Sequence, residues 1–201
     1  MKTVSISKGN SKMGAIPSIS LPACVTCNPS APCFKLCYAA KISRLYKTVD
    51  SAYKRNLDIL NNDPEEYFKA VRNAAKLQRF FRWHVSGDIP NIDYFVQMVK
   101  IARDLPGTVF LAFTKQYQIV NTCIDEFGSD SIPVNLKIRF SNWGSWKCNN
   151  RHNLPTCEII FKGNKPAENW QICGGNCTEC ACNGSGCWSL KNGETIAIYQ
   201  H

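Results

Sequence analysis

The feature that most constrains this chain is the clustering of its cysteines near the two ends. Of the twelve cysteines in 201 residues, four lie close together near the N-terminus and five near the C-terminus. The two groups are Cys24, Cys27, Cys33 and Cys37, and Cys173, Cys177, Cys180, Cys182 and Cys187. Cysteines spaced this closely can form disulfides, bind zinc or hold an iron–sulfur cluster.

The cellular compartment bears on the choice among these three chemistries. The start of the sequence lacks the apolar segment of a secretion signal, and no apolar run reaches the length of about 18 residues that spans a bilayer. We therefore expect a cytoplasmic protein without a membrane partner. Cytoplasmic thiols stay reduced, so the cysteine groups are expected to be metal ligands or redox groups.

The charge of the chain gives weaker guidance about its partners. A formal net charge of +9 can attract nucleic acid or an anionic substrate. That count treats every cysteine as neutral, whereas a four-cysteine iron–sulfur cluster carries a net negative charge of roughly two. Because the basic residues are also scattered, nucleic-acid binding remains an alternative that charge alone does not establish.

The C-terminal group has the spacing of a compact cluster site. Its four candidate ligands lie within fifteen residues and are Cys173, Cys177, Cys180 and Cys187. Zinc sites usually pair two cysteine knuckles that are separated by a dozen or more residues. The spacing therefore favours an iron–sulfur cluster, most simply [4Fe–4S]. A zinc ribbon with Cys24/Cys27 and Cys177/Cys180 as its knuckles stays open as an alternative.

The N-terminal group predicts a second metal site with fewer certain ligands. Cys27, Cys33 and Cys37 are the candidates, and Cys24 would be a fourth. Three cysteines would leave one iron open to a further ligand, whereas four would close the cluster. Most radical S-adenosylmethionine enzymes carry the motif C-x₃-C-x₂-C, but Ala40 occupies the position of the third cysteine. The spacing alone therefore does not indicate S-adenosylmethionine as a cofactor.

The middle of the chain alternates between helical and strand-like patterns. We expect helices over about 43–60, 64–77, 91–103 and 116–127, and strands over 79–88, 108–115, 136–143, 157–161 and 195–200. Short links between such elements favour a parallel sheet. The predicted fold is α/β, a partial (β/α) barrel or an open parallel sheet with cysteine-rich irregular segments at both ends. We expect one domain over 1–201, with a metal segment at 1–42, a β/α core at 43–162 and a cluster loop with the last strand at 163–201.

Side chains at the carboxyl ends of the predicted strands are candidates for chemistry, because ligands of parallel sheets bind at that edge. We predict His84, Asp88 and Lys115 as catalytic residues, and Ser86 and Gly87 as cofactor-binding residues. The period of a strand would place His84 and Ser86 on one face. The alternatives are a hydrogen-bonded core histidine, a turn or capping aspartate and a solvated lysine.

Several stretches together resemble a known family. SKMGAIPSISLPA, TCNPSAPCFKLCYAAK, FRWHVSGDIP, FLAFTKQY and GGNCTEC…GCWSL…GE are similar to the phage and prophage family that carries the "gene product 88" domain. The resemblance covers nearly the whole chain, from about residue 11 onward. It implies a phage origin, a trimmed radical-enzyme barrel and iron–sulfur clusters. It maps the family's cysteines onto Cys27, Cys33, Cys37, Cys173, Cys177, Cys180 and Cys187.

Three functions remain in view at this point. The first is an iron–sulfur redox protein, or an oxidoreductase or radical-type enzyme, that acts on a small-molecule substrate or a redox partner in the cytoplasm of a phage-carrying bacterium. The second is a zinc-stabilised nucleic-acid-binding phage protein. The third is a scaffold whose clusters are structural and which inhibits or recruits a host protein.

Overall fold

The computed structural model describes residues 3–200 and contains an open eight-stranded sheet in the order β1-β2-β3-β4-β5-β6-β8-β7. β1 runs antiparallel to β2, and the other neighbouring strands are parallel. The strands are β1 Ile6–Ser7, β2 Ser18–Ile19, β3 Phe80–Trp83, β4 Val109–Thr114, β5 Leu136–Trp143, β6 Thr156–Ile160, β7 Gln171–Ile172 and β8 Thr195–Tyr199. The predicted α/β class is confirmed in its open-sheet form, and the sheet does not close into a barrel.

The helices follow the signals at their first residues. They are α1 Tyr38–Leu45, α2 Lys47–Asn62, α3 Pro64–Ala75, α4 Ile92–Asp104, α5 Tyr117–Phe127 and α6 Cys177–Cys182, with short 3₁₀ turns η1 Pro32–Phe34, η2 Ser129–Ser131 and η3 Gly186–Trp188. Asp63 caps α3 by accepting from the Glu66 amide at 3.0 Å, and Asn91 caps α4 in the same way. Among the described residues, we find no helix whose length and apolar character would let it cross a membrane.

The helix expected over 43–60 is instead two helices. α1 begins earlier, at Tyr38, and the chain breaks at Tyr46, which has an extended backbone. α2 is then fastened to the N-terminal strands by Asn56, whose side chain bonds to Ser5 and to the Ser20 carbonyl, at 3.0 Å for the latter. The break lets α2 reach those strands while α1 stays beside the cysteines. This contact depends on distant residues, so the helical period could not reveal it.

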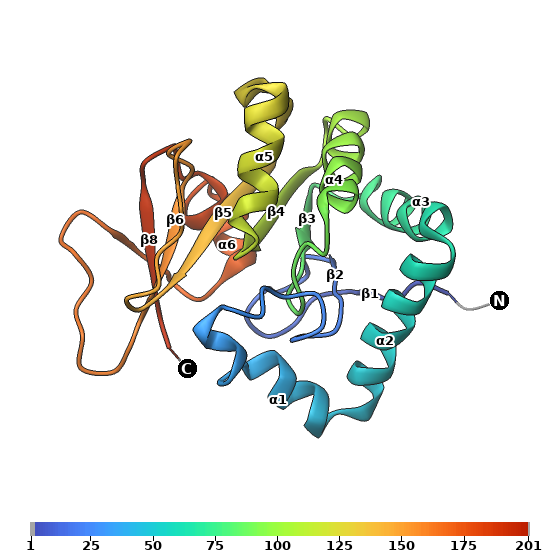
Figure 1. Cartoon of the computed structure of the whole chain (residues 1–201), viewed down its shortest axis with the longest axis horizontal. Helices are drawn as coiled ribbons and strands as arrows, with labels where there is room; N and C mark the ends of the chain where they lie inside the picture. Colours follow the sequence, from blue (N-terminus) through green and yellow to red (C-terminus); the bar gives the residue numbers. More distant parts are fainter. Residues whose placement is uncertain (1–2, 201) are drawn as a thin grey trace.

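The two faces of the sheet have different coverings (Figure 1). Large apolar side chains from β3, β4 and β5 point toward α4 and α5 and form the main core; they are Phe81, Trp83, Phe110, Ala112, Ile138 and Phe140. The opposite face carries the alternating residues, including Phe80, Leu111 and Phe113, and packs against the cysteine-rich C-terminal segment. The strands alternate in the usual way, so one set of residues builds the core and the other faces the cysteines.

The first forty residues are not irregular throughout, which corrects the sequence-based expectation. β2 pairs with β3 in register, with Ile19 opposite Trp83. Beyond β2, the Leu21 amide donates to the Ser86 carbonyl at 3.1 Å. β1 and β2 have only two residues each, too short to show a period. This pairing carries the chain to Cys24 at the carboxyl end of β3.

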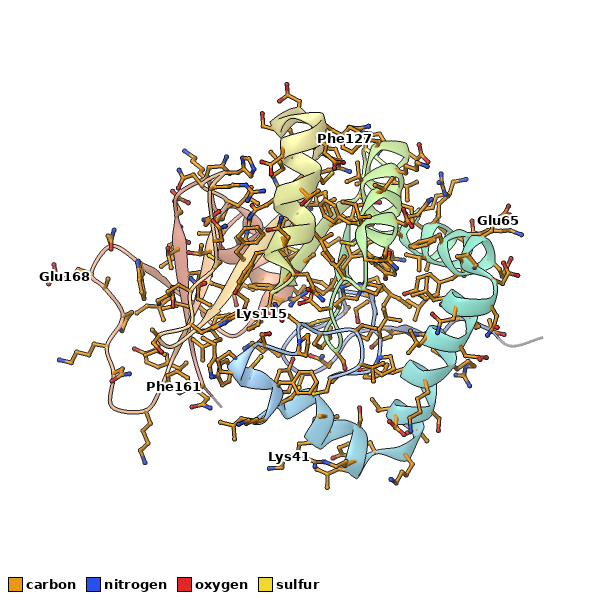
Figure 2. The ribbon with its side chains drawn as sticks, viewed as in Figure 1. Lys41, Glu65, Lys115, Phe127, Phe161 and Glu168 are labelled. Carbon is orange, nitrogen blue, oxygen red and sulfur yellow. The ribbon has the colours of Figure 1, made fainter. Side chains whose placement is uncertain are left out.

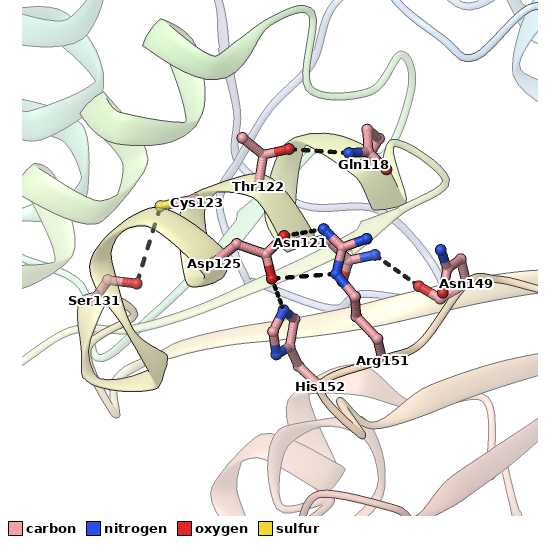
Figure 3. Close-up of polar contacts among 9 residues, drawn as sticks. All are labelled: Gln118, Asn121, Thr122, Cys123, Asp125, Ser131, Asn149, Arg151 and His152. Carbon is pink, nitrogen blue, oxygen red and sulfur yellow. Dashed lines mark hydrogen bonds and ion pairs between the residues drawn. The ribbon is translucent and has the colours of Figure 1, made fainter.

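A polar cluster fixes the connection that follows β5 (Figure 3). Asp125 on α5 accepts from the side chains of Arg151 and His152, the latter at 2.8 Å. Asn121 on the same helix donates to the Asn149 carbonyl at 2.7 Å. These contacts hold the loop against α5, where the His152 side chain is 24% exposed. His201 lies outside the described residues.

β3 ends at Trp83, earlier than the predicted strand over 79–88. His84 has a left-handed backbone with φ 51°, which is uncommon for a residue with a side chain and ends the strand alternation. Its Nε2 lies 3.0 Å from the Tyr94 hydroxyl, which in turn lies 2.9 Å from the Tyr67 hydroxyl. The two-residue period therefore does not extend to Ser86, and His84 occupies the position of a hydrogen-bonded core residue.

The burial of His84 predicts a pH dependence of stability. Burial, aided by the charge of Arg82, lowers the pKa of His84 to about 3. Between about pH 6.5 and about pH 3, the unfolded chain binds a proton at this ring and the folded chain does not. The free energy of unfolding therefore decreases as the pH is lowered through this range. Replacing the imidazole ring should remove this contribution, which changes the free energy of unfolding by up to about 1.4 kcal/mol per pH unit.

The measurement is urea unfolding between pH 7.5 and pH 4.5 (about one unit above and about two units below the ordinary histidine pKa of about 6.5). His84→Asn, which tolerates the left-handed backbone, should lose less stability on acidification than the wild type. Ring NMR signals of His84 should stay in the neutral form at the lowest pH. If the wild type and His84→Asn lost stability equally on acidification, and the His84 ring were protonated, its assignment as a buried neutral histidine would be wrong.

Candidate functional site

Hydrogen bonds place the N-terminal cysteine segment at the carboxyl ends of β3 and β4. The Asp88 amide donates to Thr26 Oγ1 at 3.1 Å, and the Gln116 side chain donates to the Thr26 carbonyl at 3.3 Å. The Asn28 side chain donates to the Lys115 carbonyl at 3.3 Å. The loop that carries Cys27 is thus held against the edge where ligands of parallel sheets bind.

Gly87 permits this close approach. Its φ is 76°, and a Cβ at this position would lie 2.7 Å from Thr26 Oγ1 and 2.8 Å from the Leu21 carbonyl. Any larger residue would push the N-terminal segment away from β3. The structure therefore places Gly87 under the cysteine loop, where it serves packing. The neighbouring Ser86 is buried, and its hydroxyl has no hydrogen-bond partner within residues 3–200.

The four N-terminal thiols lie within electrostatic reach of one another. Cys24 has a left-handed backbone with φ 62°, and its thiol interacts with Cys37 and Cys33. Cys27 interacts with Cys37 and Cys24. Burial raises the pKa of Cys27 to about 12 and that of Cys24 to about 11, with the neighbouring thiols adding to the shift. As free thiols these groups are neutral at physiological pH, and a bound metal ion would deprotonate them.

Asp88 joins β3 to β4 and faces the N-terminal thiols. One carboxylate oxygen accepts from Thr114 Oγ1 at 2.6 Å and from the Ile89 amide at 2.8 Å, and the other accepts from the Lys115 amide at 2.8 Å. Burial raises the pKa of Asp88, while these hydrogen bonds act in the opposite direction. The carboxylate thus has a structural role as well as a position beside Cys27.

Lys115 lies near the centre of the molecule in the view of Figure 2. Its ammonium donates to Ser141 Oγ at 2.8 Å. Burial raises the pKa of Cys33 and that of Cys157 on β6, and the positive charge of Lys115 partly opposes this shift at both thiols. Cys157 in turn interacts with Cys187 and Cys173 of the C-terminal group. Lys115 therefore faces Cys33 of the N-terminal group and Cys157, which adjoins the C-terminal group.

The C-terminal group is assembled from three short elements. Cys173 follows β7 and donates its amide to the Ala197 carbonyl at 2.9 Å. α6 carries Cys177 and Cys180 three residues apart on one side, and η3 carries Cys187. The segment also contacts the start of the chain, because Thr178 Oγ1 donates to the Met13 carbonyl at 2.7 Å. Distant parts of the sequence are thereby brought to one face of the sheet. Cys182, in contrast, is exposed.

Two arginines project from the sheet toward this group. Arg82 on β3 stacks over the Phe113 ring at 4.4 Å and lowers the pKa of Cys177 and Cys187, against burial. Arg139 on β5 is only 2% exposed and donates to three backbone carbonyls, including those of Cys187 at 2.7 Å and Leu190 at 3.2 Å.

The charges of these arginines are not neutralised by ion pairs. Burial lowers the pKa of Arg139 to about 10, and negative charge on Cys187 or Glu194 acts in the opposite direction. Within residues 3–200, neither guanidinium forms an ion pair with a carboxylate. A buried cation is costly without negative charge nearby. Thiolates or a cluster bound by the cysteines would supply that charge.

The fit of a metal centre therefore rests on donor chemistry and charge. Among the described side chains, no three or more cysteine, histidine, aspartate or glutamate residues form a group that could hold a metal ion. The thiols of each group nevertheless face one another, and cations surround them. Gly186 leaves room at Cys180, whose Sγ would lie 3.2 Å from an added Cβ. These features suit an anionic, sulfur-ligated group.

The structure groups the predicted residues differently from the sequence. Asp88 and Lys115 lie together beside Cys27 and Cys33, whereas His84 points toward α4 and Tyr94. Sequence reasoning missed Arg82 and Arg139. The available signal was alternation, because Arg82 lies among aromatic residues in β3 and Arg139 lies between the apolar residues Ile138 and Phe140 in β5. A charge at such a position in a sheet covered on both faces indicates a special partner.

Comparisons with known proteins show the family of this chain. The model of the family described as Gene product 88 matches residues 2–194. The Gene 88 protein of Mycobacterium phage L5 is 29% identical over 121 residues, which cover 53% of this chain and 51% of the phage protein. The Gene 88 protein of Mycobacterium phage D29 is 28% identical over 121 residues, with 53% and 50% covered.

The chain spans about half the length of the curated relatives that it matches. No solved structure matches it. The family model covers nearly all of the sequence, including both cysteine groups and the strands between them. The chain therefore belongs to the Gene product 88 family, which is represented in bacteriophages.

Proposed function

We propose that this chain is an iron–sulfur redox protein that acts in the cytoplasm of a phage-carrying bacterium. One cluster, of the [4Fe–4S] type, would be held by the C-terminal ligands Cys173, Cys177, Cys180 and Cys187. A second would be held by the N-terminal group at the carboxyl ends of β3 and β4. A bound iron–sulfur cluster supplies one-electron transfer.

The observation that carries the proposal is the pair of arginines on the cysteine-facing side of the sheet. Arg139 is buried and Arg82 is half-buried, and neither has a carboxylate ion pair within the described part of the chain. Burial raises the pKa of Cys177 and Cys187; the charge of Arg82 opposes this shift at both thiols, and the charge of Arg139 opposes it at Cys187. Thiolates or a bound cluster would supply the negative charge that neutral thiols do not.

The N-terminal ligands would be Cys27, Cys33 and Cys37, with Cys24 as the fourth. Cys24 lies outside the family pattern, yet its thiol interacts with Cys37 and Cys33. A fourth thiolate would close this centre, which favours electron transfer over binding of S-adenosylmethionine at an open iron. If a small-molecule substrate binds, Lys115 would orient an anionic group of it at the sheet edge.

The side chains around both centres would tune them. Phe80 and Trp188 pack edge to face with ring centroids 5.2 Å apart beside the C-terminal cysteines, and exclude water. Lys115 holds positive charge between the two groups. Asp88 keeps the N-terminal loop in place through its bonds to β4. His84 belongs to the core and has no role in this proposal.

The direct test is metal analysis of protein purified without air. The chain should contain iron and acid-labile sulfide, be brown and absorb broadly at about 400 nm. Electron paramagnetic resonance of the reduced protein, with and without S-adenosylmethionine, should show signals that the added compound leaves unchanged. Stoichiometric zinc without iron would reject the proposal and favour the zinc-stabilised nucleic-acid-binding alternative.

Matched cysteine variants test which thiols are ligands. Cys177→Ser should remove about half of the iron, because one of two similar clusters loses a ligand. Cys182→Ser changes an exposed cysteine of the same helix, α6, and this variant should keep the full iron content. Cys37→Ser and the buried Cys123→Ser form the corresponding pair for the N-terminal site. Equal iron in both members of a pair would refute that ligand assignment.

Removal of a single positive charge should change the electron affinity of the C-terminal centre. Arg82→Gln should make its reduction potential more negative, because the reduced cluster carries more negative charge and loses a nearby cation. Arg79→Gln removes an exposed charge from the preceding part of the same segment and should shift the potential much less. Redox titration monitored by electron paramagnetic resonance gives both values. Identical shifts would mean that Arg82 does not face the cluster.

A further inference from the structure

An exposed apolar surface lies on α1 and on the loop before it. We call it the α1 face; its members are between 39% and 67% exposed and are Leu36, Tyr38, Ile42, Leu45 and Tyr46. Three of them recur at helical spacing and therefore share one side of α1. Ala39 is the only buried residue of this helix. Figure 1 shows α1 at the rim of the molecule, below the strand ends. Contiguous apolar surface of this kind marks an interaction site.

Positive charge surrounds the α1 face. Lys35, Lys41, Arg44 and Lys47 are exposed along the same segment, and no acidic residue precedes Asp50 in the sequence. Figure 2 shows Lys41 on the outer side of the helix, away from the sheet. An apolar centre with a charged rim is the usual anatomy of a protein interface. Charge complementarity requires an acidic partner, and it disfavours a second copy of this chain because two basic rims would repel each other.

The α1 face adjoins the N-terminal cysteine group. Leu36 and Tyr38 stand on either side of Cys37 in the sequence. The Tyr38 hydroxyl donates to the Val85 carbonyl at 3.0 Å, which fixes an otherwise exposed ring. A protein that covers these two side chains would lie against the cysteine group. A rigid aromatic residue of this kind is a typical anchor of an interface.

We propose that the α1 face is the docking site for a small acidic electron-carrier protein. This inference rests on the proposed function, because it assigns to the N-terminal centre the partner from which it receives electrons. One electron would pass from the reduced flavin of such a carrier to the cluster. The flavin is thereby oxidised by one electron and the cluster reduced by one, and no covalent bond forms or breaks.

The apolar centre of the surface favours a protein over nucleic acid. Phosphate backbones are bound by basic and polar groups, and a strip of leucine, isoleucine and tyrosine would stay uncovered in such a complex. An anionic membrane surface matches both the charge and the apolar side chains, and is therefore kept as an outcome of the test. The position beside Cys37 is what favours the electron carrier.

The experiment measures binding of oxidised flavodoxin, an acidic flavin protein, to the air-free chain by isothermal titration calorimetry. The test variant is Lys41→Glu with Leu45→Asn, which reverses a rim charge and removes an apolar contact without touching a cysteine. The matched control is Lys76→Glu with Leu77→Asn at the end of α3, where Leu77 is 86% exposed. The test variant should bind at least about tenfold more weakly, equivalent to about 1.4 kcal/mol, and the control should bind like the wild type.

Stopped-flow reduction of the cluster by reduced flavodoxin should slow in the same variant, with iron content unchanged. Equal binding by the two variants, or no binding by the wild type, would overturn the inference. Binding to vesicles that contain phosphatidylserine in place of flavodoxin would also overturn it and assign the surface to lipid. An iron-free chain would reject the proposed function through metal analysis alone, whereas lost docking with an intact cluster rejects only this inference.

Discussion

A positive charge that is shielded from water needs negative charge close by, and this requirement governs the cysteine-facing side of the sheet. Arg82 and Arg139 stand on that face with Lys115 at its edge, and the groups opposite them are thiols. With neutral thiols, the hydrogen-bond partners of the Arg139 guanidinium in the described part of the chain are backbone carbonyls. Sulfur in an anionic state would supply negative charge, and the proposed clusters would make the cysteines and the sheet parts of one electrostatic arrangement.

The sheet also determines how segments far apart in sequence reach one another. β2 pairs with β3 and brings the first cysteines to the strand ends, while β7 and β8 bring the last ones to the rear face. Thr178 contacts Met13, so the segment that precedes β2 meets the C-terminal group. Lys115 faces Cys33 of the N-terminal group and Cys157, which in turn interacts with Cys173 and Cys187. The exposed basic surface of α1 lies next to Cys37, where the proposed partner would dock.

Much of the architecture could be predicted from the sequence, because it depends on local signals. The caps at Asp63 and Asn91, the apolar run of β4 and the alternation in β5 are all visible in short windows. β1, β2 and β7 have two residues each and exist only through pairing, so no window could reveal them. The break at Tyr46 and the left-handed His84 likewise depend on tertiary contacts.

For the candidate site, sequence spacing named cysteines that the fold then brings face to face, and it named Asp88 and Lys115 at the correct edge. It could not separate His84 from them, because the strand period was assumed to continue past Trp83. It also missed Arg82 and Arg139. Their alternate positions are visible in the sequence, but the burial of Arg139 and the half-burial of Arg82 depend on the segment that covers the second face of the sheet.

Native mass spectrometry of the air-free protein measures the central claim most directly, because it weighs the polypeptide together with whatever its cysteines hold. The account predicts a mass above that of the chain by two iron–sulfur clusters, with a loss of one cluster when either cysteine group is mutated. A folded protein with the mass of the polypeptide alone, or with only zinc added, would contradict it.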